Sequence, residues 1–437
     1  MNLVLVGAAG LGAFVFLCLA VARWPVLGLS AIGLQILVAW EVPQTPVLAE
    51  VAGRQLYPED VLCAVFVVIA AARWRRVGEK IRGPMLLVVP FIALLLWSLV
   101  RGVVEFGLAK PVNEAREVTY LVIASAWLFT LDWASGRATS MVRRWLFTVC
   151  SLLMVVLVYH VMVFGIGDVD SFVQVGSLQQ TARPVVAMQA FVLCCGALWA
   201  LASWLTDREP HLMVLGVVLM AGVGVGQHRS VWVAATAGLI VLLVRVSPRS
   251  LRNLVYPGIA VAWLLVIAGL AGVFDSVISN ATTALSDTGT YEWRISGLWT
   301  LVGQSVTNGV STVVFGGPYG AGWARYEDGL IVTFSPHNWY LDMYLRSGLI
   351  GLVALVGLLI TMLVRLLRRI EFAPQAALLT AILVYAWPYS LGWYIAPVLS
   401  WALLAANGSI DESCRREPEA EQRSVPEPRL ARHGSSG

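Results

Sequence analysis

Long apolar runs, separated by short charged or turn-rich segments, constrain this sequence more than any other feature. A helix that crosses a bilayer needs about 20 mostly apolar residues. Of the 437 residues, 58% are hydrophobic and only 13% are charged, whereas a soluble domain carries roughly 25% charged residues. An ordinary soluble enzyme and a disordered chain are therefore both excluded.

We predict an all-α fold, a polytopic membrane helix bundle of 12–13 spans with one long external loop. The predicted segments lie near 2–22, 25–40, 58–72, 84–100, 117–132, 145–165, 184–205, 211–227, 230–244, 254–274, 347–364, 374–390 and 393–407. Three of these thirteen are short, so the sequence does not separate twelve spans from thirteen.

The basic residues divide unevenly between alternate loops, which predicts how the chain is oriented. Short cytoplasmic loops of membrane proteins carry an excess of arginine and lysine. One set of loops holds sixteen basic residues before the C-terminal tail, and the other set holds nine. The richer set, which includes Arg73, Arg137, Arg144 and Arg368, is assigned to the cytoplasm. The net charge of +4 gives no reason to expect a nucleic-acid partner.

Three parts of the chain follow from this topology. Residues 1–407 form the membrane bundle. Within it, residues 275–346 form an external, periplasmic-side loop, whose tryptophans and tyrosines predict one or two helices across the outer mouth of the bundle. A loop this long is usually functional or disordered, so we expect any chemistry here. Residues 408–437 are charged and almost free of large apolar side chains, which predicts a disordered cytoplasmic tail.

A histidine near the end of the external loop is the first candidate for chemistry. His337 follows Ser335 and Pro336, so we expect a helix with Ser335 as its cap and His337 in its first turn. Asn338 and Asp342 share a face of that helix. Histidine titrates near pH ~6.5 and can take a proton from a sugar hydroxyl while that oxygen attacks. The alternative is a polar interfacial histidine whose neighbours satisfy its ring.

Three arginines beside spans on the outer side form a second candidate group. Arg229 lies in a break between two apolar runs, Arg294 early in the external loop and Arg183 just before a span. An arginine at bilayer depth costs about 2.5–3.5 kcal/mol, so it usually faces a partner or a cavity. Several guanidinium groups that converge would hold a diphosphate. The alternative is that these arginines snorkel to the lipid headgroups or form salt bridges. Among the other histidines, only His228 also lies on the outer side and could take the place of His337 as the base.

Glycines mark two further positions near this loop. Residues 316–322 are rich in glycine but no Gly-Lys-Ser/Thr follows them, so they do not form a nucleotide-binding P-loop. We expect them to let the loop pack tightly near the site, and we expect Gly348 to allow a bend into the next span. Because the sequence has no HExxH, CxxC or acidic cluster, we predict no metal site and no cofactor.

Taken in order, these elements resemble the O-antigen ligase and polymerase family. The resemblance covers roughly residues 180–365, and its most specific part is His337-Asn338-Trp339-Tyr340-Leu341 followed by residues 348–351, Gly-Leu-Ile-Gly. Members of this family act at the external face of the bacterial inner membrane. They transfer a saccharide from a polyprenyl-diphosphate carrier to an acceptor hydroxyl, without metal or nucleotide.

The resemblance implies roles for individual residues. His337 would be the base that activates the acceptor, and Arg229 and Arg294 would bind the diphosphate. Arg183 would be a further diphosphate-binding residue, although Pro184 and Val185 follow it where the family commonly has an Asn-Pro-Asn-like stretch. The supporting residues would be Asn338, Tyr340 and Asp342.

The expected protein is therefore a multi-pass glycosyltransferase of the bacterial inner membrane. Its partners would be a polyprenyl-diphosphate-linked glycan, a glycan or lipid acceptor, and membrane lipids. Ligase and polymerase share this chemistry, so the motifs do not distinguish them. Two alternatives stay open: a transporter or flippase of the same lipid-linked glycan, and a non-catalytic membrane scaffold.

Overall fold

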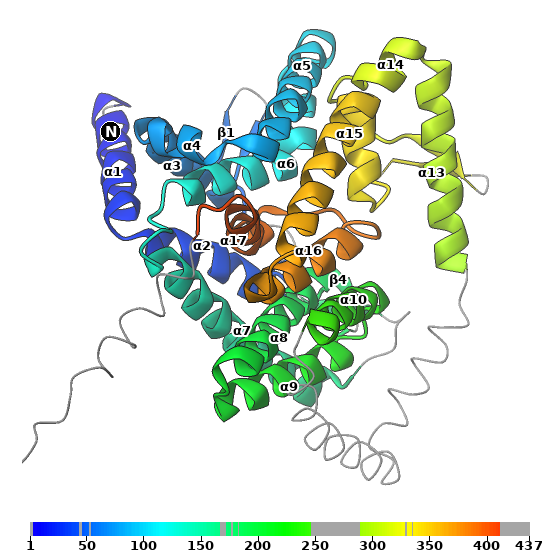
Figure 1. Cartoon of the computed structure of the whole chain (residues 1–437). Helices are drawn as coiled ribbons and strands as arrows, with labels where there is room; N and C mark the ends of the chain where they lie inside the picture. Colours follow the sequence, from blue (N-terminus) through cyan, green and yellow to red (C-terminus); the bar gives the residue numbers. More distant parts are fainter. Residues whose placement is uncertain are drawn as a thin grey trace, which may run out of the picture.

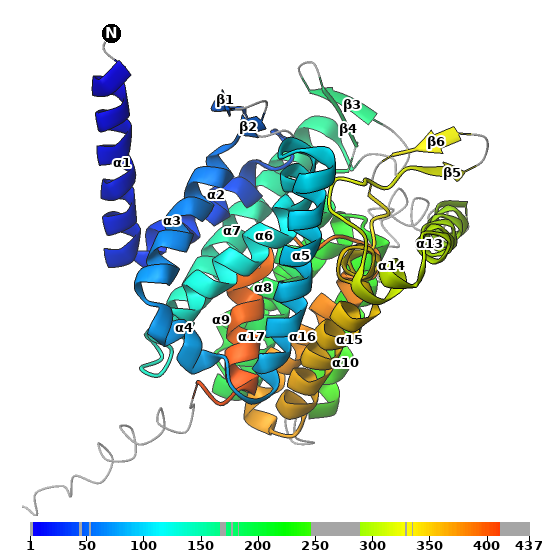
Figure 2. The same cartoon turned by 90° about the horizontal axis from the view of Figure 1, so that it is seen from above.

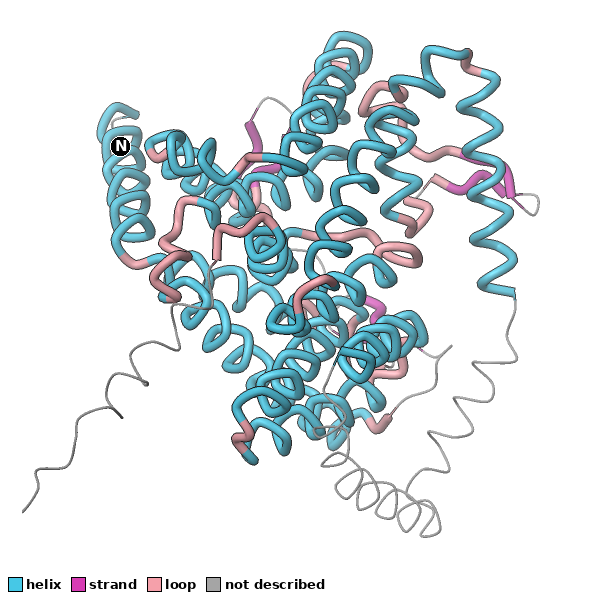
Figure 3. The backbone as a smooth tube through the Cα atoms, in the orientation of Figure 1, coloured by secondary structure: helices cyan, strands magenta, loops and turns pink. Residues whose placement is uncertain are grey.

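The computed structural model describes residues 3–42, 46–51, 54–166, 172–175, 178–181, 183–245, 289–327, 330–333 and 335–410. Helices dominate this part of the chain (Figures 1 and 3), and its strands are short. The helices are α1 (Leu3–Arg23), α2 (Pro25–Val38), α3 (Pro58–Ala72), α4 (Trp74–Lys80), α5 (Val88–Phe106), α6 (Ala109–Phe129), α7 (Arg137–Phe164), α8 (Ala187–Asp207), α9 (Pro210–Val225), α10 (Arg229–Arg245), α13 (Gly289–Thr307), α14 (Val310–Phe315), α15 (Trp339–Leu367), α16 (Ala373–Tyr385) and α17 (Ala396–Ala406), with 3₁₀ turns η1 (Gly83–Leu87), η2 (Ile370–Phe372) and η3 (Trp393–Ile395).

The predicted all-α fold is confirmed. Twelve of the thirteen predicted apolar segments coincide with helices, and the segment near 254–274 lies outside the described residues. Among the described residues, four helices are long and apolar enough to cross a membrane: Gly83–Phe106, Arg137–Phe164, Ala187–Thr206 and Trp339–Leu367. The pair α1 and α2, bent by 104°, would be a fifth span if it crosses as one broken helix.

These helices are typical of a multi-pass membrane protein, whereas the number of 12–13 spans stays a prediction. The predicted external loop contains two helices, α13 and α14. Its first part, residues 275–288, and the predicted tail from residue 411 onward lie outside the described residues.

Helix α8 is one of the most deeply buried helices of the described bundle. Residues 189–200 are all buried, as expected for a helix that is apolar on every side and packed on every side. Two stacked aromatic pairs fasten it to its neighbours. Phe191 stacks on Tyr385 of α16 with ring centroids 3.9 Å apart, and Trp199 stacks on Trp401 of α17 at 3.7 Å.

The helices around α8 show which of their ends lie together. α8 and α9 form one helical hairpin and α9 and α10 form another, so α8 and α10 begin at the same end of the bundle. α16 runs in the opposite direction, because Phe191 near the start of α8 meets Tyr385 at the end of α16. Further along, Gly238 of α10 lies between Leu198 and the backbone of Ala377.

Three short antiparallel hairpins, which the sequence did not predict, precede helix starts. Each of them ends a few residues before α3, α8 or α15 begins, and all three lie along one side of the bundle in Figure 2. We call this side, where α8 and α10 also begin, the hairpin end. The hairpins pair β1 (Ala49–Val51) with β2 (Arg54–Leu56), β3 (Phe172–Val175) with β4 (Leu178–Thr181), and β5 (Arg325–Glu327) with β6 (Leu330–Val332).

Helix α15 differs from the prediction at its start and agrees with it further along. The predicted cap at Ser335 and the place of His337 in the first turn are wrong, since the helix begins at Trp339. Asn338 is the cap: its side-chain oxygen accepts the N–H of Leu341 at 3.0 Å, which satisfies a free donor of the first turn. The expected bend is present at Gly348, which has φ 65° and ψ −171° within the helix.

Replacing Gly348 by alanine should therefore destabilise the protein. A Cβ atom there would lie 2.3 Å from the carbonyl oxygen of Val314, in a backbone conformation that other residues rarely adopt. We expect a loss of about 1–3 kcal/mol, measured as a lower thermal unfolding temperature in detergent. Gly357→Ala is the control, since a Cβ there meets only Leu87 Cδ1 at 3.8 Å. Equal unfolding temperatures for the two variants would contradict this explanation.

Candidate functional site

His337 lies at the surface, directly before the start of α15. Its side chain is exposed, whereas the residues on either side of it, Pro336 and Asn338, are buried. Its φ of 50° is in the left-handed region, which histidine adopts more readily than most residues. The buried neighbours therefore hold the backbone while the imidazole stays accessible from solvent.

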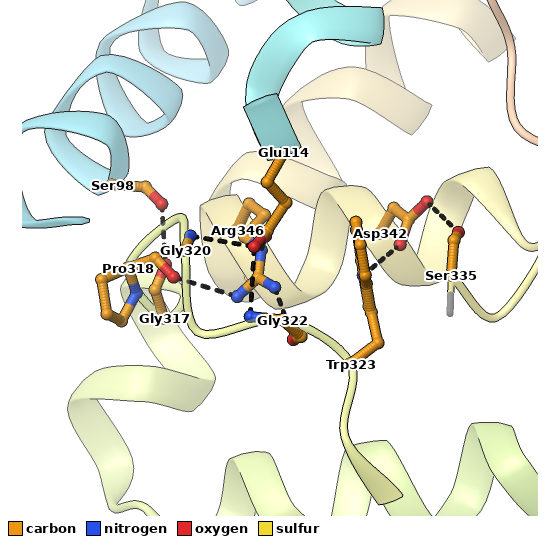
Figure 4. A network of polar contacts seen from close by, with 10 residues as sticks. All are labelled: Ser98, Glu114, Gly317, Pro318, Gly320, Gly322, Trp323, Ser335, Asp342 and Arg346. Atoms are coloured by element: carbon orange, nitrogen blue, oxygen red, sulfur yellow. Dashed lines mark hydrogen bonds and ion pairs between the residues drawn. The ribbon is translucent and has the colours of Figure 1, made fainter. Parts of the chain in front are cut away.

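Asp342 ties together three segments near this histidine. One carboxylate oxygen, Oδ1, accepts the indole N–H of Trp323 at 2.9 Å. The other, Oδ2, accepts the hydroxyls of Ser335 at 3.2 Å and Ser390 at 3.3 Å. Ser335 is two residues before His337, so Asp342 anchors the segment that carries the histidine (Figure 4).

Asn338 and Tyr340 hold the same segment to the bundle. Asn338 caps α15 through the N–H of Leu341. The Tyr340 hydroxyl donates to the backbone carbonyl of Leu383 on α16 at 2.8 Å. Beside it, the backbone N–H of Trp339 donates to the carbonyl of Ala386 at 3.0 Å. The three residues predicted to support the site thus share one effect: they fix the start of α15.

Arg183 lies against His228 at the hairpin end. Arg183 Nη1 is 3.1 Å from His228 Nδ1, although the two residues are far apart in the sequence. The backbone carbonyl of Arg183 also accepts the indole N–H of Trp40 at 2.8 Å. The structure therefore joins two regions that the sequence singled out separately.

The surroundings of His228 determine its tautomer and its charge. Arg183 carries only donors, so His228 Nδ1 accepts and the proton sits on Nε2, which donates to the carbonyl of Val185 at 2.8 Å. Burial and the nearby guanidinium lower the pKa of His228 to about 3. His228 is 4% exposed and both ring nitrogens are engaged. It is therefore a poor candidate for the base, unlike the exposed His337.

Arg229 and Arg294 have different relations to this pair. Arg229 directly follows His228 and is the half-buried first residue of α10. Arg294 lies near the start of α13, and its side chain is outside the described residues. α13 meets α15 later along its length, where the hydroxyls of Ser305 and Tyr344 are 3.2 Å apart. Among the described contacts, none brings Arg294 to the other two arginines.

Three of the predicted residues nevertheless lie at the same end of the bundle. Arg183 precedes α8 and Arg229 begins α10, and both helices start at the hairpin end. The start of α15 joins them there, because Trp339 bonds to Ala386, the C-terminal cap of α16. His337 thus shares the hairpin end with the two arginines.

A buried ion pair fixes the glycine-rich loop beside α15. Arg346 Nε pairs with Glu114 Oε1, and the two side chains are 5% and 6% exposed. Glu114 Oε2 accepts the N–H groups of Gly320 at 2.9 Å and Gly322 at 3.1 Å. Arg346 in turn donates to the carbonyls of Pro318 at 3.1 Å and Gly322 at 2.8 Å (Figure 4). The two side chains therefore neutralise each other's charge and also form hydrogen bonds with the backbone N–H and C=O groups of the loop.

The loop also packs on α5, in accord with the expectation from its glycines. Ser98 Oγ donates to the carbonyl of Gly317 at 2.7 Å, and Arg101 Nη2 donates to that of Gly316 at 2.6 Å. Gly316 has φ 84°, and a Cβ there would lie 2.4 Å from the carbonyl carbon of Arg346. Only glycine allows this contact without a shift of the backbone.

Sequence reasoning missed the partners of this loop. It gave no functional role to Arg346, Glu114, Ser98 or Trp323. One signal was available: Glu114 and Arg346 lie directly before predicted apolar segments, where a charged side chain needs a polar partner or access to the membrane surface. That signal does not say which partner, because the two residues are far apart in the sequence. Within the described residues, no group of three His, Cys, Asp or Glu side chains could hold a metal ion.

No known protein family, curated protein or solved structure matches this chain. The likeness of residues 180–365 to the O-antigen ligase and polymerase family thus stays a prediction. The geometry at the hairpin end is the independent ground for a functional proposal.

Breaking the ion pair should destabilise the protein strongly. Glu114→Gln or Arg346→Met leaves one buried charge without its partner, which costs about 3–5 kcal/mol. We expect the double variant to cost less than the sum of the two, because neither charge is then left alone. Chemical unfolding in detergent would measure this. Glu105→Gln, at an exposed position on α5, is the matched control and should stay within about 0.5 kcal/mol of wild type. Single variants as stable as this control would contradict the assignment.

The state of His228 predicts a loss of stability in acid. The pKa of its imidazole is about 3 in the folded protein against 6.5 unfolded, so below pH ~6.5 the unfolded chain binds a proton that the folded chain does not. Stability should fall by up to ~1.4 kcal/mol per pH unit from this residue. His228→Asn should therefore lose less stability than wild type between pH ~7 and ~5, measured by thermal unfolding. His211→Asn, whose parent side chain is 72% exposed, should match wild type; a wild-type acid slope in His228→Asn would refute the assigned charge state.

Proposed function

We propose that this protein is a glycosyltransferase of the bacterial inner membrane with its site on the external face. It moves a saccharide from a polyprenyl-diphosphate carrier to an acceptor hydroxyl. The observation that carries the proposal is the exposed His337 at the same end of the bundle as Arg183 and Arg229. A base and an anion-binding pair at one end are what this chemistry needs.

The proposed reaction is a single displacement at the anomeric carbon. His337 takes the proton of the acceptor hydroxyl as that oxygen attacks the anomeric carbon. The bond between this carbon and the diphosphate oxygen breaks, and polyprenyl diphosphate leaves with both bonding electrons. Because diphosphate is already a good leaving group, positioning and neutralisation of charge are the main contributions that the protein makes.

The arginines supply that neutralisation in this proposal. Arg229 and Arg183 flank the buried His228, and Arg294 is assigned to the same diphosphate through the resemblance alone. Guanidinium groups bind phosphate oxygens bidentately, so no cation is required. Asn338, Tyr340 and Asp342 act as positioning residues, because their contacts hold the segment that bears His337.

The decisive experiment replaces His337 by asparagine, a residue that tolerates the left-handed backbone. The purified protein would be reconstituted in vesicles with a labelled polyprenyl-diphosphate glycan and an acceptor glycan. We expect transfer to fall by about 10²–10⁴-fold, the usual contribution of a general base, without a change in unfolding temperature. His211→Asn is the matched control and should transfer at the wild-type rate.

Two results would overturn the proposal. The first is wild-type transfer by His337→Asn, which would remove the base. The second is movement of the labelled carrier across the vesicle membrane with no transfer of glycan by the wild-type protein. That outcome would identify a transporter of the lipid-linked glycan instead.

A further inference from the structure

A crevice of about 1010 Å³ lies between α2 and α7. α7 ends at the hairpin end, where His160 bonds to the carbonyl of Pro184 at 2.6 Å. The crevice is lined by the opposite, N-terminal half of α7. The α2 wall extends to Leu37, whose carbonyl accepts a hydrogen bond from Gln189 in the first turn of α8, so the crevice runs toward the hairpin end. None of the candidate site residues lines it, so a ligand bound in it would not depend on the proposed function.

The face of α7 that lines the crevice is basic at its N-terminal end and uncharged further along. Arg137, Ser140, Arg144, Thr148 and Leu152 line the crevice at intervals of three or four residues, so they share one face of the helix. Met141 and Trp145 line the crevice beside the two arginines, and beyond Trp145 the wall carries no charge.

The wall that α2 contributes is mostly apolar. Val26, Leu34 and Leu37 line the crevice from this helix. Leu34 is 62% exposed and the facing Leu152 of α7 is 46% exposed. The apolar part of the crevice therefore opens sideways along the bundle. A hydrocarbon chain in the surrounding bilayer could enter from this side without crossing a polar surface.

The dimensions fit one leaflet of a membrane. With a rise of 1.5 Å per residue, the helical distance from Arg144 to Leu152 is about 12 Å. Half of a bilayer's hydrocarbon core is about 15 Å thick. A phosphate at the level of Arg144 would thus place its acyl chain along the apolar part of the crevice.

The guanidinium groups in the basic part are available to bind such a phosphate. The side chains of Arg137 and Arg144 are both exposed. Within the described residues, neither guanidinium forms a salt bridge or a hydrogen bond. Asp132, which is exposed and does not line the crevice, interacts electrostatically with Arg137.

We propose that this crevice binds one anionic phospholipid, with its phosphate between Arg137 and Arg144 and an acyl chain between α2 and α7. The basic and apolar parts match the two ends of such a lipid. Both arginines belong to the loops that the charge distribution assigns to the cytoplasm, and the cytoplasmic leaflet is the one rich in anionic lipid.

Native mass spectrometry of the full-length protein in detergent, titrated with phosphatidylglycerol or phosphatidylcholine, would test this. We expect one phosphatidylglycerol to bind in preference to phosphatidylcholine. Each arginine near a lipid surface contributes about fivefold in affinity, so Arg137→Gln with Arg144→Gln should weaken binding by about 30-fold. Arg144→Gln alone has a matched control in Arg143→Gln, because each removes one charge from adjacent residues of α7 and only Arg144 lines the crevice. The first should weaken binding about fivefold and the second should leave it unchanged.

A second variant tests the apolar part. Ser30 lines the crevice from α2 and is exposed, so Ser30→Phe should fill the space and weaken binding of phosphatidylglycerol while the unfolding temperature is unchanged. Equal binding of phosphatidylcholine by the wild-type protein would overturn the proposal, since it would indicate ordinary annular lipid. Full competition by inorganic phosphate would also overturn it, because the occupant would then be a free anion. Equal effects of Arg144→Gln and of Arg143→Gln would likewise rule out a specific phosphate position.

Discussion

The buried ion pair between Glu114 and Arg346 is the contact on which the geometry around His337 depends. Two charges in an apolar bundle are costly unless each finds several polar partners. Here the partners are the backbone groups of the glycine-rich loop, so the loop, α6 and α15 are fixed by one pair. Trp323, at the end of that loop, then reaches Asp342, whose carboxylate also binds Ser335 beside the histidine.

Two histidines at the hairpin end show how surroundings decide what a titratable group can do. His228 is enclosed, and its free lone pair faces a guanidinium, which disfavours a second proton. His337 stands at the surface between two buried residues. The same side chain is therefore a structural element in one place and a candidate for proton transfer in the other. Sequence spacing alone could not make this distinction, because it carries no information on burial.

The apolar segments were predictable because length and composition within a segment suffice to indicate a membrane helix. The start of α15 was not, since Pro336 suggested an early start while the left-handed backbone at His337 and the cap at Asn338 delay it. The three hairpins were missed because strands of three or four residues are too short to show an alternating pattern. The grouping of Arg183 with His228, like the ion pair, depends on contacts between distant parts of the chain.

The break at Gly348 divides α15 into two mechanically distinct pieces. The outer piece is held by Arg346 to the loop and to α6, whereas the inner piece packs among the apolar helices. Membrane helices adjust to a thinner or thicker bilayer by tilting. A tilt of the inner piece would not have to pass through a continuous helix to reach the residues before Trp339. A change in membrane thickness would reach the segment around His337 through the contacts of Trp339 and Tyr340 with α16, and not along α15 itself.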